Sequence, residues 1–292
     1  MDTVRPGGAI NRRTLLAGSV ATVLLGGVGV NRADAATTAG PATVSSLTKS
    51  DPFYIAHRGG GRNWPAMTAY AYEQASKIPN LTALEISVCI TADGVLVCSH
   101  NPTTTDMTGV PYTIANETWD TLSSLMVSPK YTLDPKQPSR PFTRFDEVVD
   151  RYSDDFVLFV EPKVSAAAAP LMARMAGLKQ PERVVWKQPI NSWRFWPAKK
   201  RGFSTWGYVL DEPAHTGDNL LRYAASGDID MLGAYNATSD ELISQVVEAA
   251  GAEGKQSIMW EIKTLAQRER ALSLGCAGLM TSNVVGVVNA PL

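Results

Sequence analysis

The stretch "FYIAHRGGGRNWPAMT", residues 53–68, joins an apolar, strand-like run to a charged and flexible turn. The run ends at His57 and Arg58, which three glycines follow. Glycines let the backbone approach a ligand closely, and an arginine binds phosphate oxygens through charge-assisted hydrogen bonds. The stretch therefore indicates an anion site at the end of a strand. A core strand closed by an ordinary turn is the alternative interpretation.

Seven further apolar runs of strand length follow, at residues 83–91, 156–161, 183–188, 204–210, 230–235, 257–261 and 278–281. Segments with the apolar spacing of helices lie between several of them, at residues 66–77, 166–177, 192–201, 239–252 and 265–274. Near-continuous apolar strands that alternate with helices are typical of a parallel sheet covered on both faces. Eight such units in about 240 residues favour a single-domain TIM (β/α)8 barrel over residues 51–292.

The first 35 residues have the features of an export signal. Residues 11–16, NRRTLL, are similar to the twin-arginine motif, and residues 33–35 form a small-residue cleavage site. The apolar stretch between them is short for a membrane span, so we expect a removed signal and no stable membrane anchor. Residues 36–50 are rich in Thr, Ser and Ala and are expected to be a flexible lead-in. The sequence therefore predicts a secreted protein exported through the twin-arginine route.

The overall composition is that of an ordinary globular protein. The chain has 292 residues, of which 45% are hydrophobic and 19% charged, and its formal net charge is −1. A nucleic-acid-binding protein would need a basic face. The near-neutral charge therefore argues against a nucleic-acid partner.

The stretch "ALEISVCITADGVLVCSHNP", residues 83–102, contains two apolar runs joined at Asp93 and Gly94, the dipeptide favoured by a two-residue type I′ turn. With the turn centred there, Cys89 faces Cys98 in a non-hydrogen-bonded pair, where Cα atoms are about 4.5 Å apart. That separation suits a disulfide, and an exported protein meets oxidising conditions. The register therefore predicts a Cys89–Cys98 bridge. Two small core residues packed side by side are the alternative.

Several polar side chains are expected to meet at one end of the barrel. Glu85 and Ser87 share one face of their strand by the period-two rule, and His100 joins that face across the hairpin. Glu161 ends the third apolar run, as His57 ends the first. Because the chemistry of such barrels lies where the strands end, we expect these residues to form a site at the carboxyl rim.

With these residues identified, the chain resembles the glycerophosphodiester phosphodiesterase family. The resemblance runs in order from residue 53 to about residue 285, and the block 57–109 is its specific part. The residues that carry it are His57-Arg58-Gly59, Glu85-x-Ser87 with the following hairpin and His100-Asn101, Glu161-Pro162-Lys163, Trp260, and the closing Gly275, Gly278 and Thr281.

The resemblance implies a TIM barrel that uses a divalent metal, such as Ca²⁺ or Mg²⁺, to split a small glycerophosphodiester into glycerol phosphate and an alcohol. It implies His57 and His100 as the acid and base, because imidazole titrates near neutral pH. Arg58 and Lys163 would bind the phosphate oxygens. The implied metal ligands are Glu85 and Glu161, joined by the neutral oxygens of Ser87 and Asn101.

The chain departs from the family pattern in one direction, because four positions that carry acids in the family are neutral. They are Ala66, Ser87, Asn101 and Ser282. Fewer ligand charges predict a weaker metal site. Alternatively, the metal is dispensable, and Arg58 and Lys163 provide the positive charge in its place. A non-catalytic barrel that binds phosphate or head groups is the alternative function, and transfer to a cyclic phosphate is another.

Three aromatic residues are candidates for the wall of the pocket. Trp64 follows the first strand and Tyr235 ends the sixth, so both could contact a cationic head group, and packing of the loop is the favoured alternative. Trp260 joins them through the resemblance. Glu261 and Lys263 repeat the Glu-x-Lys spacing and are expected to be a solvated ion pair.

Overall fold

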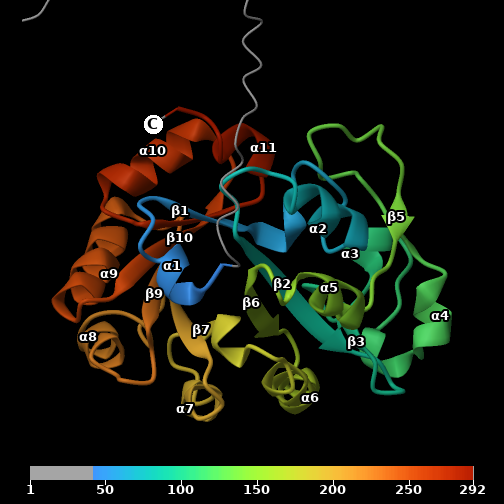
Figure 1. Cartoon of the computed structure of the whole chain (residues 1–292), viewed down its shortest axis with the longest axis horizontal. Helices are drawn as coiled ribbons and strands as arrows, with labels where there is room; N and C mark the ends of the chain where they lie inside the picture. The colour runs from blue at the N-terminus through green and yellow to red at the C-terminus, as the bar shows by residue number, and fades with distance from the viewer. Residues whose placement is uncertain (1–41, 292) are drawn as a thin grey trace, which may run out of the picture. The chain divides into compact units, whose positions relative to one another are not determined.

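Eight parallel strands close into a barrel in the computed structural model, which describes residues 42–291 (Figure 1). They are β1 (Phe53–Ala56), β2 (Ala83–Ile90), β6 (Val157–Pro162), β7 (Val184–Pro189), β8 (Ser204–Val209), β9 (Met231–Tyr235), β10 (Gln256–Ile262) and β11 (Gly278–Thr281). Strand β1 pairs with β2 on one side and β11 on the other, which closes the ring. The predicted TIM (β/α)8 barrel is confirmed.

Helices surround the barrel and cover the outer face of the strands (Figure 1). They are α2 (Ala69–Ala75), α5 (Phe145–Tyr152), α6 (Ser165–Ala176), α7 (Phe195–Lys199), α8 (Asp218–Ala224), α9 (Asp240–Ala252), α10 (Leu265–Ser273) and α11 (Val284–Val287). Helix α5, which the apolar spacing did not single out, buries Phe145, Val148, Val149 and Tyr152 at helical spacing. Its strongly amphipathic pattern explains why it packs against the barrel.

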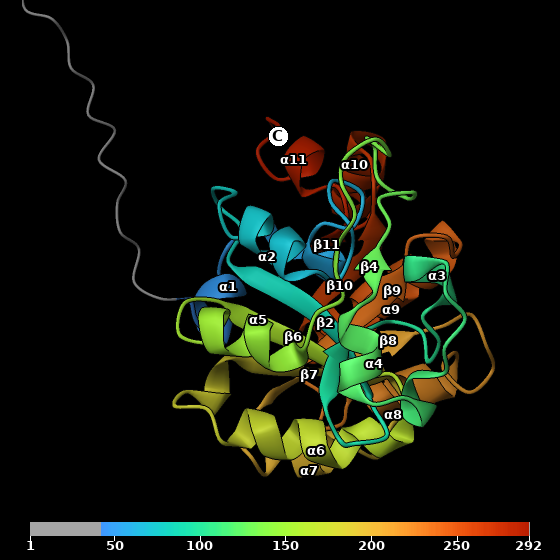
Figure 2. The ribbon, with the colours of Figure 1, turned by 90° about the vertical axis from the view of Figure 1, so that its right-hand side faces the viewer.

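The segment 99–144 between the hairpin and α5 lies along one side of the barrel (Figure 2). It contains α3 (Thr105–Thr108), a 3-10 turn (Ile114–Asn116), α4 (Trp119–Ser123) and the short strands β4 (Met126–Val127) and β5 (Arg140–Pro141). Its side chains form a small core with the hairpin, including Ile114, Leu122 and Phe142. This segment therefore has structure of its own.

The barrel interior follows the period-two alternation of its strands. One cluster fills its lower part with apolar side chains from every strand: Phe53, Ile55, Ala83, Val157, Phe159, Val185, Trp206, Met231, Ile258 and Met280. The next inward positions along the same strands are polar or aromatic, among them His57, Glu85, Glu161, Lys187 and Tyr208. An apolar plug thus supports a polar layer at the carboxyl rim.

Residues 42–50, the second part of the lead-in predicted at residues 36–50, contain a short helix that contacts the barrel. Helix α1 (Val44–Leu47) begins with a capping box in which Thr43 accepts from the Ser46 N–H. Ala42 and Leu47 are buried in the interior cluster. The predicted twin-arginine signal lies outside the described residues. Within residues 42–291, no helix is long and apolar enough to cross a membrane.

The hairpin register differs from the prediction by one residue. Strand β3 (Leu96–Cys98) pairs with β2 so that Val88 faces Cys98 and Cys89 faces Val97. The turn has a three-residue loop, because the Thr91 N–H donates to the Val95 carbonyl and Gly94 takes a left-handed φ of 83°. Three-residue hairpin loops with a left-handed last residue are a common alternative to the type I′ turn.

The shifted register rules out the predicted Cys89–Cys98 disulfide, and this is a correction. A one-residue slip moves a side chain to the other face of the sheet. Cys98 packs in the main core, Cys89 packs in the small core of segment 99–144, and both are free thiols. Burial raises the pKa of Cys89 to about 12. Cys276 is also a free, buried thiol.

Candidate active site

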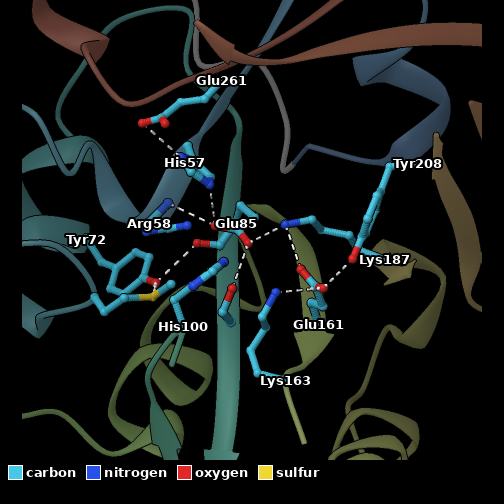
Figure 3. A network of polar contacts seen from close by, with 12 residues as sticks. His57, Arg58, Tyr72, Glu85, His100, Glu161, Lys163, Lys187, Tyr208 and Glu261 are labelled. Carbon is cyan, nitrogen blue, oxygen red and sulfur yellow. Dashed lines mark hydrogen bonds and ion pairs between the residues drawn. The ribbon is translucent and has the colours of Figure 1, made fainter. Parts of the chain in front are cut away.

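The predicted site residues lie together at the carboxyl rim, around a cavity of about 310 Å³. The cavity is lined by His57, Arg58, His100, Glu161, Lys163, Lys187, Tyr208, Leu210, Tyr235, Trp260 and Glu261. Glu85 is fully buried and lies amid these side chains (Figure 3). The sequence therefore located both histidines, both predicted carboxylates and both predicted phosphate-binding cations correctly at one end of the barrel.

The glycine-rich stretch after β1 forms a tight turn that carries two of these residues. Arg58, Gly59 and Gly60 all have positive φ, of 55°, 71° and 84°. At Gly60 a side chain would also collide with Val284 and Trp64. The turn aims the Arg58 backbone N–H at Glu85 Oε2, 3.0 Å away. The glycine-rich turn therefore forms part of a polar site, and the alternative interpretation, an ordinary turn that closes a core strand, is wrong.

Trp64 differs from the prediction, because it does not line the cavity. Its ring packs over Gly60 and against the main core outside the barrel. The other two predicted aromatic residues, Tyr235 and Trp260, do line it. Their ring centroids are 5.5 Å apart, and Tyr208 lies 5.1 Å from Trp260. These three rings form one wall of the cavity.

His57 lies between two carboxylates and is almost completely buried (Figure 3). Its Nδ1 is 3.3 Å from Glu261 Oε1, and its Nε2 is 4.0 Å from Glu85 Oε2. Burial, helped by the Arg58 guanidinium, lowers the pKa of His57 below its usual value, while the two carboxylates oppose that shift. The imidazole is therefore neutral at neutral pH but has acceptors beside both nitrogens.

His100 is oriented by its chain neighbour. Its Nδ1 lies 2.8 Å from Asn101 Oδ1, and Asn101 Nδ2 donates to Asp106 Oδ2 at 2.7 Å. Since the Asn101 oxygen must accept, Nδ1 carries the proton and Nε2 is free to accept one. Burial, Arg58 and Lys163 lower the pKa of His100 to about 4. Asn101 therefore positions His100 and does not join the two predicted carboxylate ligands.

Glu85 is held by three donors. The Lys187 Nζ lies 2.8 Å and the Ser87 hydroxyl 3.1 Å from Oε1, while Oε2 accepts from the Arg58 backbone N–H. Burial alone would raise the pKa of Glu85, but the Lys187 ammonium, followed by His57 and Arg58, lowers it well below its usual value. Glu85 is therefore an ionised carboxylate with both oxygens in use.

Glu161 has a similar set of partners. Its Oε1 accepts from Lys163 Nζ at 3.0 Å and from the Tyr208 hydroxyl at 2.9 Å, and its Oε2 is 2.8 Å from Lys187 Nζ. Burial opposes ionisation, but Lys187 and Lys163 lower the pKa of Glu161. Lys187 thus contacts both Glu85 and Glu161 (Figure 3). Burial alone would lower the pKa of Lys187, but Glu161 and Glu85 raise it.

The sequence reasoning missed Lys187, Tyr208 and Glu261. Lys187 and Tyr208 follow the inward-facing Val185 and Trp206 by two residues, so a strict period-two reading of each strand would have found them. Glu261 forms the expected ion pair with Lys263, and it also reaches the site. The register of β10 shifts between Trp260 and Ile262, and such an irregularity re-aims a side chain. Glu261 contacts Lys263 at 3.1 Å and also His57.

The structure defines a TIM-barrel protein with two histidines beside carboxylates and cations at its carboxyl rim, where such barrels have their active sites. The model of the glycerophosphoryl diester phosphodiesterase family matches residues 57–285. The chain belongs to this family. A search of curated proteins gave no match.

Solved structures with the same fold carry related descriptions. A phosphodiesterase from Oleispira antarctica, solved with the product sn-glycerol-3-phosphate, has 18% identity and a TM-score of 0.64, over 80% of this chain and 94% of that one. A glycerophosphodiester phosphodiesterase from Thermotoga maritima has 17% identity and a TM-score of 0.64, over 80% and 96%. One from Parabacteroides distasonis has 17% identity and a TM-score of 0.63, over 84% and 90%. At these identities the likeness shows the fold.

The family generally uses a divalent metal, and the arrangement around Glu85 and Glu161 does not fit one. Hard divalent cations need several oxygen ligands with free lone pairs. Among residues 42–291, no three His, Cys, Asp or Glu side chains group as a metal site. The Ser87 hydroxyl donates to Glu85, Asn101 faces His100, and an ammonium stands between the two carboxylates. The predicted ligand set therefore does not form a cation cage.

Proposed function

We propose that the protein is a phosphodiesterase that hydrolyses glycerophosphodiesters or related phospholipid head groups, with His57 and His100 as its acid–base pair. Family membership supports the reaction class. The observation that carries the proposal is that both imidazoles line one cationic cavity with Arg58 and Lys163. Water adds to phosphorus, and the bond from phosphorus to the leaving alcohol oxygen breaks.

The cations of the cavity are suited to a singly charged phosphodiester. Arg58 and Lys163 present donors at its lining, where charge-assisted hydrogen bonds to the non-bridging oxygens would hold the phosphorus. The aromatic wall of Tyr208, Tyr235 and Trp260 would face the alcohol part of the substrate. Substrate orientation thus comes from fixed charge on one side and ring faces on the other.

The surroundings divide the two proton-transfer roles. Glu261 and Glu85 favour the protonated form of His57, and this form, the minor one at neutral pH, would protonate the leaving oxygen. Burial, Arg58 and Lys163 keep His100 unprotonated at neutral pH, so the lone pair on its free Nε2 is available to take a proton from water. Each turnover then returns one proton from His100 to solvent and one from solvent to His57.

The test uses glycerophosphocholine and glycerophosphoethanolamine, with release of glycerol phosphate as the readout. His57→Asn and His100→Asn should each lower kcat/KM by about 10²- to 10⁴-fold, the usual worth of a positioned acid or base. The third histidine provides a matched control, because His215 binds the Leu210 N–H through Nδ1 and does not line the cavity. Full turnover in both active-site variants would contradict the mechanism.

A second function is favoured by the four acidic positions of the family that are neutral here. In that case the barrel binds phosphate-bearing head groups without cleaving them. It would show ligand-dependent thermal stabilisation and no product, and any histidine-dependent turnover would exclude it. Phosphorus NMR of the products separates hydrolysis from transfer to a cyclic phosphate.

We further propose export through the twin-arginine route, on the basis of Arg12 and Arg13 and the cleavage site at residues 33–35. Replacing both arginines by lysine should retain the protein inside the cell. Equal amounts of both forms outside the cell, measured by immunoblot of fractions, would contradict this route.

A further inference from the structure

The ammonium of Lys187 lies between the two carboxylates that the family pattern marks as metal ligands. Its Nζ is 2.8 Å from Glu85 Oε1 and 2.8 Å from Glu161 Oε2. The three side chains come from the neighbouring strands β2, β6 and β7, and at most 5% of each is exposed. Lys187 also lines the cavity, so this bridge lies at the edge of the substrate space.

The position of Lys187 is closely determined by its surroundings. The ring centroids of Trp206 and Tyr208 lie 5.6 and 5.8 Å from its Nζ, on the aromatic side of the site. A buried ammonium without anionic partners is costly, so a conformation that leaves both carboxylates is disfavoured. The lysine is therefore a built-in part of the site.

The two carboxylates of the bridge are balanced by lysines without a metal. Glu85 and Glu161 contribute two negative charges, and Lys187 and Lys163 contribute two positive charges. A divalent cation at the same place would add two further positive charges beside an ammonium. The neutral Ser87, where the family has a ligand carboxylate, fits a site built around a monovalent cation.

We propose that Lys187 is the resident cation of this active site, that it takes the place of a divalent metal between Glu85 and Glu161, and that it acts as a further catalytic residue. An ammonium has three protons. One is donated to Glu85 Oε1, and Glu161 Oε2 is an ion-pair partner 2.8 Å from Nζ. A proton of the ammonium is thus available to a non-bridging oxygen of the phosphodiester in the cavity. The catalytic part of this inference rests on the proposed function, whereas the part about cation binding does not.

Direct cation binding tests the inference without any turnover. Mn²⁺ is added to the full-length protein up to about 1 mM, the range of weak extracellular cation sites, and bound ion is measured by electron paramagnetic resonance. We expect no bound Mn²⁺ that depends on the two carboxylates. A stoichiometric Mn²⁺ that Glu161→Gln or Glu85→Gln removes would overturn the inference.

Removal of the Lys187 ammonium should create the Mn²⁺ site that the unchanged protein lacks. Lys187→Ala should gain a Mn²⁺ site, and adding Glu161→Gln to it should abolish that site. Lys163→Ala is the matched control, because Lys163 also contacts Glu161 but leaves the bridge in place, and it should gain no site. A folded Lys187→Ala protein, verified by circular dichroism, that gains no site would count against the inference. Where that variant does not fold, the wild-type measurement decides.

Turnover after metal removal tests the catalytic part. After dialysis against a chelator, kcat/KM for glycerophosphocholine should stay within about twofold, and added Ca²⁺ or Mg²⁺ should not raise it. Loss of activity that a metal restores would overturn the inference. Absence of turnover under every condition would contradict the proposed function, and the Mn²⁺ measurement would still decide the role of Lys187.

Discussion

The two ends of the barrel interior are built from the same eight strands and have opposite chemistry. Below, the inward side chains form a layer of apolar residues that α1 covers. Above, the next inward positions are His57, Glu85, Glu161 and Lys187, which contact one another through charges. The apolar layer and the polar layer are only two residues apart along each strand. The same strands can therefore provide a rigid core at one end and the reactive side chains at the carboxyl rim.

The largest expected effect on stability is at the lower end. Phe159→Ala removes a fully buried ring from the interior cluster and should lower the free energy of unfolding by about 3–5 kcal/mol, through lost burial and a cavity. Urea denaturation measures this loss. At the rim, Tyr235→Ala truncates a ring that is 39% exposed and should cost less than about 1 kcal/mol while raising KM. Equal losses of unfolding free energy in the two variants would contradict the division into a stabilising end and a functional end.

A smaller effect is expected where a carboxylate positions a catalytic group. Glu261→Gln should lower kcat/KM by about 10- to 100-fold, because His57 loses the partner of its Nδ1. The pH–rate limb that reports His57 should also move to lower pH, since a carboxylate no longer stabilises the imidazolium. Lys263→Gln removes only the outer partner of Glu261 and is the control. If the pH–rate limb of Glu261→Gln does not move, Glu261 has no electrostatic effect on His57 and only packs against it.

Acid should lower the free energy of unfolding through His100 at the rim. The pKa of His100 is about 4 in the folded protein and near its usual 6.5 in the unfolded chain, so the unfolded chain binds more protons between these values. The free energy of unfolding should therefore fall as pH drops from 6.5 to 4, by roughly 2 kcal/mol after solvent screening. Equilibrium unfolding at several pH values measures the slope. In His100→Asn this fall should be smaller, and an unchanged slope would exclude His100 as its source.

The smallest expected effect concerns the hairpin. Because Cys89 and Cys98 lie on opposite faces of the ribbon, a reducing agent should leave Tm unchanged within about 1 °C, whereas a lost disulfide typically costs about 2–4 kcal/mol. Thiol titration of the mature, unfolded protein without reductant should find three thiols. A titre of one would restore the predicted bridge.

The features predicted correctly from the sequence are those that depend on local periodicity. Apolar runs located the strands, and strand ends located His57 and Glu161, because the carboxyl ends of parallel strands meet at one rim. The hairpin register was wrong because a two-residue and a three-residue turn both suit Asp93-Gly94, and only packing selects between them.

Contacts between distant segments account for what the sequence did not predict. Lys187 contacts Glu85, which is 102 residues away along the chain, and Glu161, which lies on the neighbouring strand. No local sequence pattern around Lys187 indicates either partner. Glu261 is aimed at His57 by an irregularity in β10 that no local pattern signals. In both cases the function of a charge is determined by which strand becomes its neighbour.

The short helix α1 belongs to the folded barrel. Because Ala42 and Leu47 close the mouth of the barrel opposite the cavity, a shortened gene that starts at Asp51 would leave the rings and side chains of Phe53 and Ile55 open to water. Recombinant versions for crystallisation or assay should therefore start upstream of Ala42, even though the first strand of the barrel begins eleven positions later, at Phe53.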